Sequence, residues 1–312
     1  MKRKSQKPPR EKPSTDDLLD GFGEDDRKRY EQFGDRAKNS QFRKMERTAE
    51  LRAADGLTAE EIQTLPIGQV LQVFSLFYKV GHPTGNRLCV ARKTLSRLSE
   101  TAIVVGDEVH FRDSKAELDP DSPAQAEAVI EQVLPRRTVL TRANSFNRDR
   151  QHPIVANAQQ MLIVASLIEP KVKWGLIDRM IVAAKSGGLD PIICLNKIDL
   201  AAGAADAVTE MTFAEKALAH YASLGYRCCK VSVTEKSGLE ELRDLLKDKA
   251  TVLAGHSGVG KSSLISAVQP GLDIRVGAVS RFTEKGIHTT TSARRYDLDF
   301  GGCVIDTPGV KM

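Results

Sequence analysis

The order of three short motifs along the chain is the strongest constraint on its fold. An N-K-I-D motif at Asn196–Asp199 comes first, then G-H-S-G-V-G-K-S at Gly255–Ser262, then D-T-P-G at Asp306–Gly309. The second motif has the complete G-x-x-x-x-G-K-S pattern of a phosphate-binding loop. In ordinary GTPases the phosphate loop comes first and the guanine-recognition loop, N-K-x-D, follows late in the chain. The order here predicts a P-loop GTPase core that is circularly permuted.

The sequence around each motif supports this interpretation. Short apolar runs, each typical of a buried strand, precede the three motifs at Pro191–Leu195, Ala250–Ala254 and Cys303–Ile305. A helix is expected directly after the phosphate loop. In open α/β sheets, ligands bind beyond the carboxyl ends of the strands, and all three motifs fall there. A further buried strand is expected at Met161–Ser166, with helices in 173–186, 238–248 and Ser262–Val268. We therefore expect a doubly wound α/β domain with a parallel sheet, spanning residues 152–312.

The phosphate loop supplies the groups that a nucleoside triphosphate requires. Gly258 and Gly260 let the backbone approach a phosphate and turn its N–H groups inward. Lys261 would neutralise the β- and γ-phosphates, and the Ser262 hydroxyl would hold Mg²⁺. The residues expected around the phosphates are Gly255, His256, Ser257, Gly258, Val259, Gly260, Lys261, Ser262 and Ser263.

The N-K-I-D motif favours guanine over adenine. Asp199 can accept two hydrogen bonds, from guanine N1–H and from its exocyclic amine, whereas adenine N1 is itself an acceptor. Asn196 and Lys197 complete the base-binding loop. Ser232 follows a predicted strand, Tyr226–Val231, and is placed to support the base; a turn or N-cap serine is an equally good interpretation of it.

Two further segments are expected to respond to the γ-phosphate. Asp306 would bind Mg²⁺ through water, and the Gly309 N–H would meet the γ-phosphate. The segment Gly286–Thr291 has three consecutive threonines, of which we favour Thr290 for binding Mg²⁺. Many GTPases place a glutamine after D-x-x-G to orient the attacking water. This chain has Val310 there, so His288 becomes a candidate for that role.

The chain before the α/β domain divides into two parts. Residues 1–64 are highly charged with few apolar positions, so we expect a disordered extension with at most a transient helix near Phe42–Ala54. Residues 65–145 contain five short runs with strand patterning, which predict a small β-barrel of the OB-fold type, commonly an RNA-binding fold. Its basic face could be formed by Arg92, Lys93, Arg97, Arg136, Arg137 and Arg142.

Charge and cysteine content bound the location and the partners. The formal net charge is +5 with a pI near 8.9, which permits an RNA partner. The five cysteines include no C-x-x-C pair, which fits a reducing compartment. No apolar run reaches the length of a membrane span, and the first residues lack an apolar signal region, so we expect a cytoplasmic protein with no membrane contact.

With these residues in view, the chain resembles the ribosome small subunit-dependent GTPase A family. The resemblance covers about 65–312 and rests on the barrel, N-K-I-D, the phosphate loop, G-x-H-T-T-T and D-T-P-G followed by a hydrophobic residue. It implies a monomeric GTPase, using GTP and Mg²⁺, that acts in late maturation of the small ribosomal subunit, contacts rRNA and is stimulated by that subunit. It also implies that His288 is catalytic alongside Lys261. Ile287 departs from the family, which usually has arginine there.

The resemblance also implies a C-terminal helical domain with a structural zinc. The sequence ends at Met312, and the zinc ligands are absent from it. We therefore expect a GTPase domain cut after its second switch. Two alternatives stay open: a truncated module that binds GTP or GDP on the ribosome with negligible hydrolysis, and an unrelated P-loop ATPase or kinase, against which Asn196–Asp199 argues.

Overall fold

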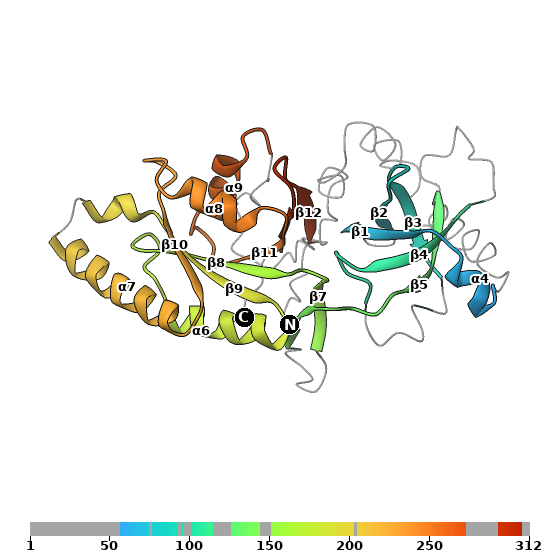
Figure 1. The fold of residues 1–312 in the computed structure, drawn as a ribbon, viewed down its shortest axis with the longest axis horizontal. Helices are drawn as coiled ribbons and strands as arrows, with labels where there is room; N and C mark the ends of the chain where they lie inside the picture. The colour runs from blue at the N-terminus through green and yellow to red at the C-terminus, as the bar shows by residue number, and fades with distance from the viewer. Residues whose placement is uncertain are drawn as a thin grey trace, which may run out of the picture.

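The structure is a computed structural model that describes residues 57–74, 77–92, 95, 102–114, 126–143, 151–202, 205–272 and 293–307. It has a β-barrel at one end and a larger α/β unit at the other (Figure 1). A short helix, α4 (Ala59–Gln63), precedes the barrel and begins with a reciprocal capping box between Thr58 and Glu61. This part of the segment expected to be disordered is therefore helical. Phe42–Ala54 lies outside the described residues.

The first five strands close into a barrel. They are β1 (Ile67–Val73), β2 (Tyr78–Gly81), β3 (Arg87–Ala91), β4 (Glu108–Asp113) and β5 (Ala128–Val133). They pair in the order β1-β2-β3-β5-β4, and β4 returns to pair with β1. Alternate apolar residues point inward, and Val70, Val80, Val109, Phe111 and Ile130 form the core. The barrel predicted from the strand spacing is confirmed.

The α/β unit is built on a mostly parallel sheet. Its strands lie in the order β10 (Arg227–Val231), β9 (Asp190–Asn196), β8 (Gln160–Ser166), β11 (Ala250–Ala254), β13 (Cys303–Asp306) and β12 (Arg294–Asp297). Only β12, among these described strands, runs antiparallel to its neighbour in the sheet. The phosphate-loop strand β11 therefore lies in the middle of the sheet, and the N-K-I-D strand β9 lies two strands away.

Helices cover both faces of this sheet, as Figure 1 shows. One face packs against α6 (Trp174–Ser186) and α7 (Ala205–Ser223), and the other against α8 (Leu239–Leu246) and α9 (Lys261–Val268). Strand β8 has apolar side chains on both sides, so Ile163 joins the first core and Leu162 the second. The expected doubly wound fold is confirmed. Among the described helices, none is long and apolar enough to cross a membrane.

Two structural links join the barrel to the α/β unit. Strand β6 (Val139–Ala143) pairs with β7 (Gln151–Ala156), and Leu140 and Val155 pack in the same apolar core as α6. In addition, β1 of the barrel pairs with β12 through a single pair of residues, Gln72 and Arg294, so that the two sheets are continuous. The boundaries predicted for the two domains, 65–145 and 152–312, stay predictions.

The turn at Gly106 requires a glycine. Its φ is +92°, and a Cβ at this position would lie 1.9 Å from the carbonyl oxygen of Ala156 in β7. A side chain cannot be accommodated without moving the barrel away from the α/β unit.

Gly106→Ala should therefore lower the free energy of unfolding by about 2 kcal/mol or more, since a strained left-handed residue alone costs 1–3 kcal/mol. Chemical denaturation measures this. Gly175→Ala in α6 is the matched control, because a Cβ there meets no atom within 4 Å. Equal stability of the two variants would contradict the close approach at Gly106.

Candidate nucleotide-binding site

The phosphate loop connects β11 to α9 with a backbone that only glycine adopts readily. Gly255, Gly258 and Gly260 have φ values of +145°, +84° and +90°. A Cβ on Gly260 would lie 2.6 Å from Nδ2 of Asn196, so the missing side chain lets the two loops meet. No side chain among the described residues caps the start of α9, and its first turn has no acidic residue. Free N–H groups at a helix N-terminus form a ready anion site.

The N-K-I-D loop is hydrogen bonded to the phosphate loop. Asn196 Nδ2 donates to the carbonyl oxygen of Val259 at 2.9 Å, and Lys197 Nζ donates to that of Gly258 at 2.9 Å. Lys197 Nζ also donates to the carbonyl oxygen of Glu169, at 2.6 Å, in the loop after β8. We call these bonds the inter-loop contact. They hold the residues expected to bind the base and those expected to bind the phosphates at a fixed separation.

The acceptor expected to read guanine is oriented by a serine. Ser232, which is fully buried, donates from Oγ to Oδ1 of Asp199 at 2.7 Å. The same hydroxyl accepts a hydrogen bond from the Glu235 backbone N–H at 3.0 Å. Ser232 is therefore a turn serine, and it also contacts Asp199; that it supports a bound base stays a prediction.

Lys261 and Asp306 are partly buried and attract each other electrostatically. Burial lowers the pKa of the Lys261 ammonium, and Asp306 opposes this shift. Burial raises the pKa of the Asp306 carboxyl, and the opposing influences are Lys261 and the Thr307 backbone N–H. In both groups desolvation outweighs the attraction between them. An anion beside Lys261 and a cation beside Asp306 would each favour the charged form.

Some of the remaining predicted site residues are described by the structure, and others lie outside the described residues. Lys261 Nζ donates to the carbonyl oxygens of Gly255 and His256 at 3.0 and 3.2 Å. The exposed His256 ring lies against the Ser257 carbonyl oxygen, Nδ1 to O, at 2.9 Å. Ser262 is half-buried and Ser263 exposed in the first turn of α9. His288, Thr290, Gly309 and Val310 lie outside the described residues.

One buried polar atom of the N-K-I-D loop lacks a hydrogen-bond partner among the described residues. This atom is Oδ1 of Asn196. Leaving a buried acceptor unpaired costs about 1–3 kcal/mol. The uncapped helix start and the glycine backbone fit an anionic group, whereas the unpaired oxygen fits a hydrogen-bond donor.

The glutamate carbonyl in the inter-loop contact is a feature that sequence reasoning missed. Glu169 takes part through its backbone oxygen, so its residue type gives no signal.

The basic face predicted for the barrel needs correction at Arg136, which donates two hydrogen bonds to the buried Asp107. Arg92 pairs with the buried Glu131. Lys93 and Arg97 lie outside the described residues.

Solved structures share this architecture. YjeQ from Thermotoga maritima is 34% identical, with a TM-score of 0.57 over 78% of this chain and 74% of that one. YloQ, described as a circularly permuted GTPase, is 26% identical, with a TM-score of 0.54 over 82% of this chain and 75% of that one. The family model named RsgA GTPase matches residues 133–312. The chain belongs to the RsgA GTPase family.

Curated relatives agree with this assignment. The small ribosomal subunit biogenesis GTPase RsgA of Chlorobaculum tepidum is 38% identical over 253 residues, which are 78% of this chain and 76% of that protein. RsgA 1 of Vibrio vulnificus strain YJ016 is 40% identical over 210 residues, which are 67% of this chain. The chain spans 56% of the length of this Vibrio relative. The circularly permuted core predicted from the sequence agrees with the description of YloQ as a circularly permuted GTPase.

Ser232→Ala should lower the affinity for guanine nucleotides about tenfold or more, because a hydrogen bond to a charged group is worth 1.5–3 kcal/mol. Titration calorimetry with GDP measures the change. Ser237→Ala is the matched control, since Ser237 forms the same β-bridge with Ser232 through backbone atoms only. If both variants bind GDP like the unsubstituted chain, Asp199 does not depend on Ser232.

Proposed function

We propose that this protein binds GTP with Mg²⁺, hydrolyses it to GDP and phosphate, and acts in late maturation of the small ribosomal subunit. The observation that carries the proposal is the inter-loop contact, together with Asp199 held by Ser232 at the end of the same loop. It joins one group suited to guanine and one suited to phosphates in a single rigid site. The names of the relatives, small ribosomal subunit biogenesis GTPases, support the choice of partner.

Guanine selectivity follows from the chemistry of Asp199. A carboxylate accepts from guanine N1–H and from the exocyclic amine, whereas adenine would present its N1 lone pair. Sites built on such hydrogen bonds reject an analogue that lacks them by about 10⁴-fold or more. Because Ser232 fixes the carboxylate, the site loses little rotational freedom when it binds the base.

The phosphate and metal positions are assigned to residues around the start of α9. The N–H groups of the phosphate loop and Lys261 would hold the β- and γ-phosphates, and Ser262 with Asp306 would hold Mg²⁺, with Thr290 as the expected third group. Bound Mg²⁺ would neutralise charge on the phosphate oxygens. Partial burial of Lys261 and Asp306 supports this assignment, since charges act more strongly where water is displaced.

His288 is proposed to position the attacking water. The support is indirect: Val310 stands where many GTPases have glutamine, and valine offers no hydrogen-bonding group. The Gly309 N–H would meet the γ-phosphate. Ordering of these segments by the γ-phosphate is a common device in GTPases.

The barrel is proposed to contact rRNA. Its five-stranded closed form supports this, because such barrels commonly bind nucleic acid. Arg142, predicted on the barrel's basic face, is exposed but lies on β6, outside the five barrel strands, and is a candidate contact next to the barrel along the chain. A monomer that acts in the cytoplasm fits this role, since the proposed partner is a ribosomal subunit.

The direct test is the rate of GTP hydrolysis with and without purified small ribosomal subunits. We expect slow turnover alone and stimulation by the subunit, with Lys261→Ala abolishing nucleotide binding and both activities. Nucleotide binding without stimulated turnover would favour the alternative of a binding module that does not hydrolyse GTP.

Asp199→Asn should lower the ratio of GTP to ATP affinity by about 100-fold or more, because the amide presents a donor where guanine also presents one. Competition binding with both nucleotides gives the ratio. Asp190→Asn makes the same substitution at the opposite, exposed end of β9 and should leave it unchanged. An unaltered ratio in Asp199→Asn would refute the assignment of this loop to guanine.

A further inference from the structure

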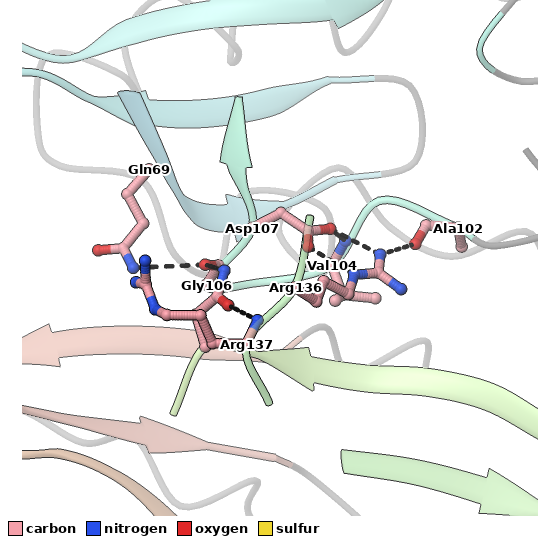
Figure 2. Close-up of polar contacts among 8 residues, drawn as sticks. Gln69, Ala102, Val104, Gly106, Asp107, Arg136 and Arg137 are labelled. Carbon is pink, nitrogen blue, oxygen red and sulfur yellow. Dashed lines mark hydrogen bonds and ion pairs between the residues drawn. The ribbon is translucent and has the colours of Figure 1, made fainter. Parts of the chain in front are cut away.

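The barrel meets the α/β unit at two places that differ in kind. The first, which we call the junction, consists of Gly106, Asp107, Arg136, Arg137 and Asn157. Figure 2 labels the first four of these residues. Asn157 Nδ2 donates to the Gly106 carbonyl oxygen at 3.0 Å, and its Oδ1 accepts from the Arg137 N–H at 2.8 Å. This link is buried and densely bonded, so we expect it to be rigid.

Asp107 strengthens the barrel side of the junction. Its carboxylate is fully buried and accepts from Arg136 Nε and Nη2 at 2.7 and 2.8 Å, and from the Val104 N–H at 2.8 Å. A third guanidinium hydrogen bond, from Arg136 Nη2, goes to the Ala102 carbonyl oxygen at 2.8 Å (Figure 2). Such bidentate, charge-assisted bonds fix geometry as well as energy.

The second place is the single residue pair between β1 and β12. Gln72 of β1 pairs with Arg294 of β12, and Arg294 pairs in turn with Asp306 at the end of β13. One row across the sheet therefore runs from the barrel to the residue proposed to hold Mg²⁺. Strand β12 also follows the predicted switch segment Gly286–Thr291 along the chain.

Gln69 connects these two places. Its Nε2 donates to the Gly106 carbonyl oxygen at 3.3 Å, which is the same oxygen that Asn157 binds. Its Oε1 accepts a hydrogen bond from Arg295 Nη1 in β12. Its backbone is paired on both sides within the barrel, with Gly81 and Glu108. A side chain with a fixed base and two bonded ends can transmit a small displacement of β12.

We propose that Gln69 is a positioning residue that couples the barrel to the nucleotide site through Arg295. A barrel held on its partner would restrain β12, and β12 would restrain Asp306 across their shared row. By thermodynamic linkage, nucleotide binding would affect the barrel equally. This proposal rests on the proposed function for the identity of the partner, but the coupling itself belongs to this chain.

Arg295 is suited to this role because its other side-chain contacts hold it in place. Its Nε and Nη2 bond to Oδ1 of Asp297 at 2.9 and 2.8 Å, within the same strand. The guanidinium therefore moves with β12. Its hydrogen bond to Gln69 links a movement of β12 to β1.

The test compares three variants of the full chain by amide hydrogen exchange and by GTP hydrolysis. Gln69→Leu removes both polar ends of the side chain at similar size. Gln69→Glu keeps an acceptor for Arg295 and removes the donor to Gly106. Gln132→Leu makes the same change as the first variant at an exposed position of β5 and serves as control. Denaturation curves establish that each variant is folded.

In the unsubstituted chain, Mg²⁺ with a non-hydrolysable GTP analogue should slow exchange in β1 by about fivefold or more, the lower end of usual coupling factors. Gln69→Leu should lose this effect while its affinity for the analogue changes less than twofold, and Gln69→Glu and Gln132→Leu should keep it. No effect of nucleotide on β1 in the unsubstituted chain would overturn the coupling. A Gln69→Glu variant that behaves like Gln69→Leu would overturn the role of Arg295.

The rate of GTP hydrolysis in the presence of small ribosomal subunits gives a test that is independent of hydrogen exchange. Gln69→Leu should bind subunits normally yet show reduced stimulation, whereas Gln132→Leu should be stimulated fully. Full stimulation of Gln69→Leu would overturn the coupling. A lack of stimulation in the unsubstituted chain would refute the proposed function, and the exchange experiment would still decide the coupling.

Discussion

Hydrogen bonds between the N-K-I-D loop and the backbone of the phosphate loop are the interaction on which the site depends. Strands β9 and β11, which present these loops, are not neighbours, because β8 lies between them. Asn196 and Lys197 reach across the end of β8 to carbonyl oxygens of the phosphate loop, and Lys197 also binds the loop that follows β8. The absence of a Cβ on Gly260 permits this approach. These contacts depend on where the loops lie in the fold and not on their order along the chain, so circular permutation preserves them.

Lys261 and Asp306 do not stabilise each other's charged form enough to offset the effect of burial. Burial disfavours the charged forms of both Lys261 and Asp306, and their mutual attraction only partly offsets this. A pair optimised for stability would show the opposite balance. Perturbed pKa values of this kind cluster at functional sites. The start of α9, which no described side chain caps, adds a partial positive charge beside Lys261.

Apolar runs and loop motifs made most of the fold predictable. The strand Ala250–Ala254 was located from sequence to the residue, because a buried parallel strand is a continuous apolar run bounded by a glycine-rich loop. Strand β12, Arg294–Asp297, has no apolar alternation and gives no such signal. It forms because β13 and β1 offer it partners. The sequence also gives no signal for side-chain contacts between distant residues. The hydrogen bond between Gln69 and Arg295, for example, joins residues 226 positions apart.

The site was predictable as far as residue type decides the chemistry. The roles of Asp199 and Lys261 stay predictions, which rest on the few side chains that suit guanine and phosphate. Arg136 was misassigned to a basic face, because its partner Asp107 becomes buried only when the barrel closes. The backbone oxygen of Glu169 had no signal in the sequence at all. Residue identity predicts ligand chemistry, whereas tertiary packing decides which charges stay available to a ligand.

One rigid site is proposed to bind guanine and the phosphates together. Calorimetric titration of the chain with GDP and with ADP tests it most directly, because the two ligands share every phosphate contact and differ in the base. We expect GDP to bind at least about 10⁴-fold more tightly than ADP. Affinities within about tenfold of each other, a difference of 1.4 kcal/mol, would contradict it.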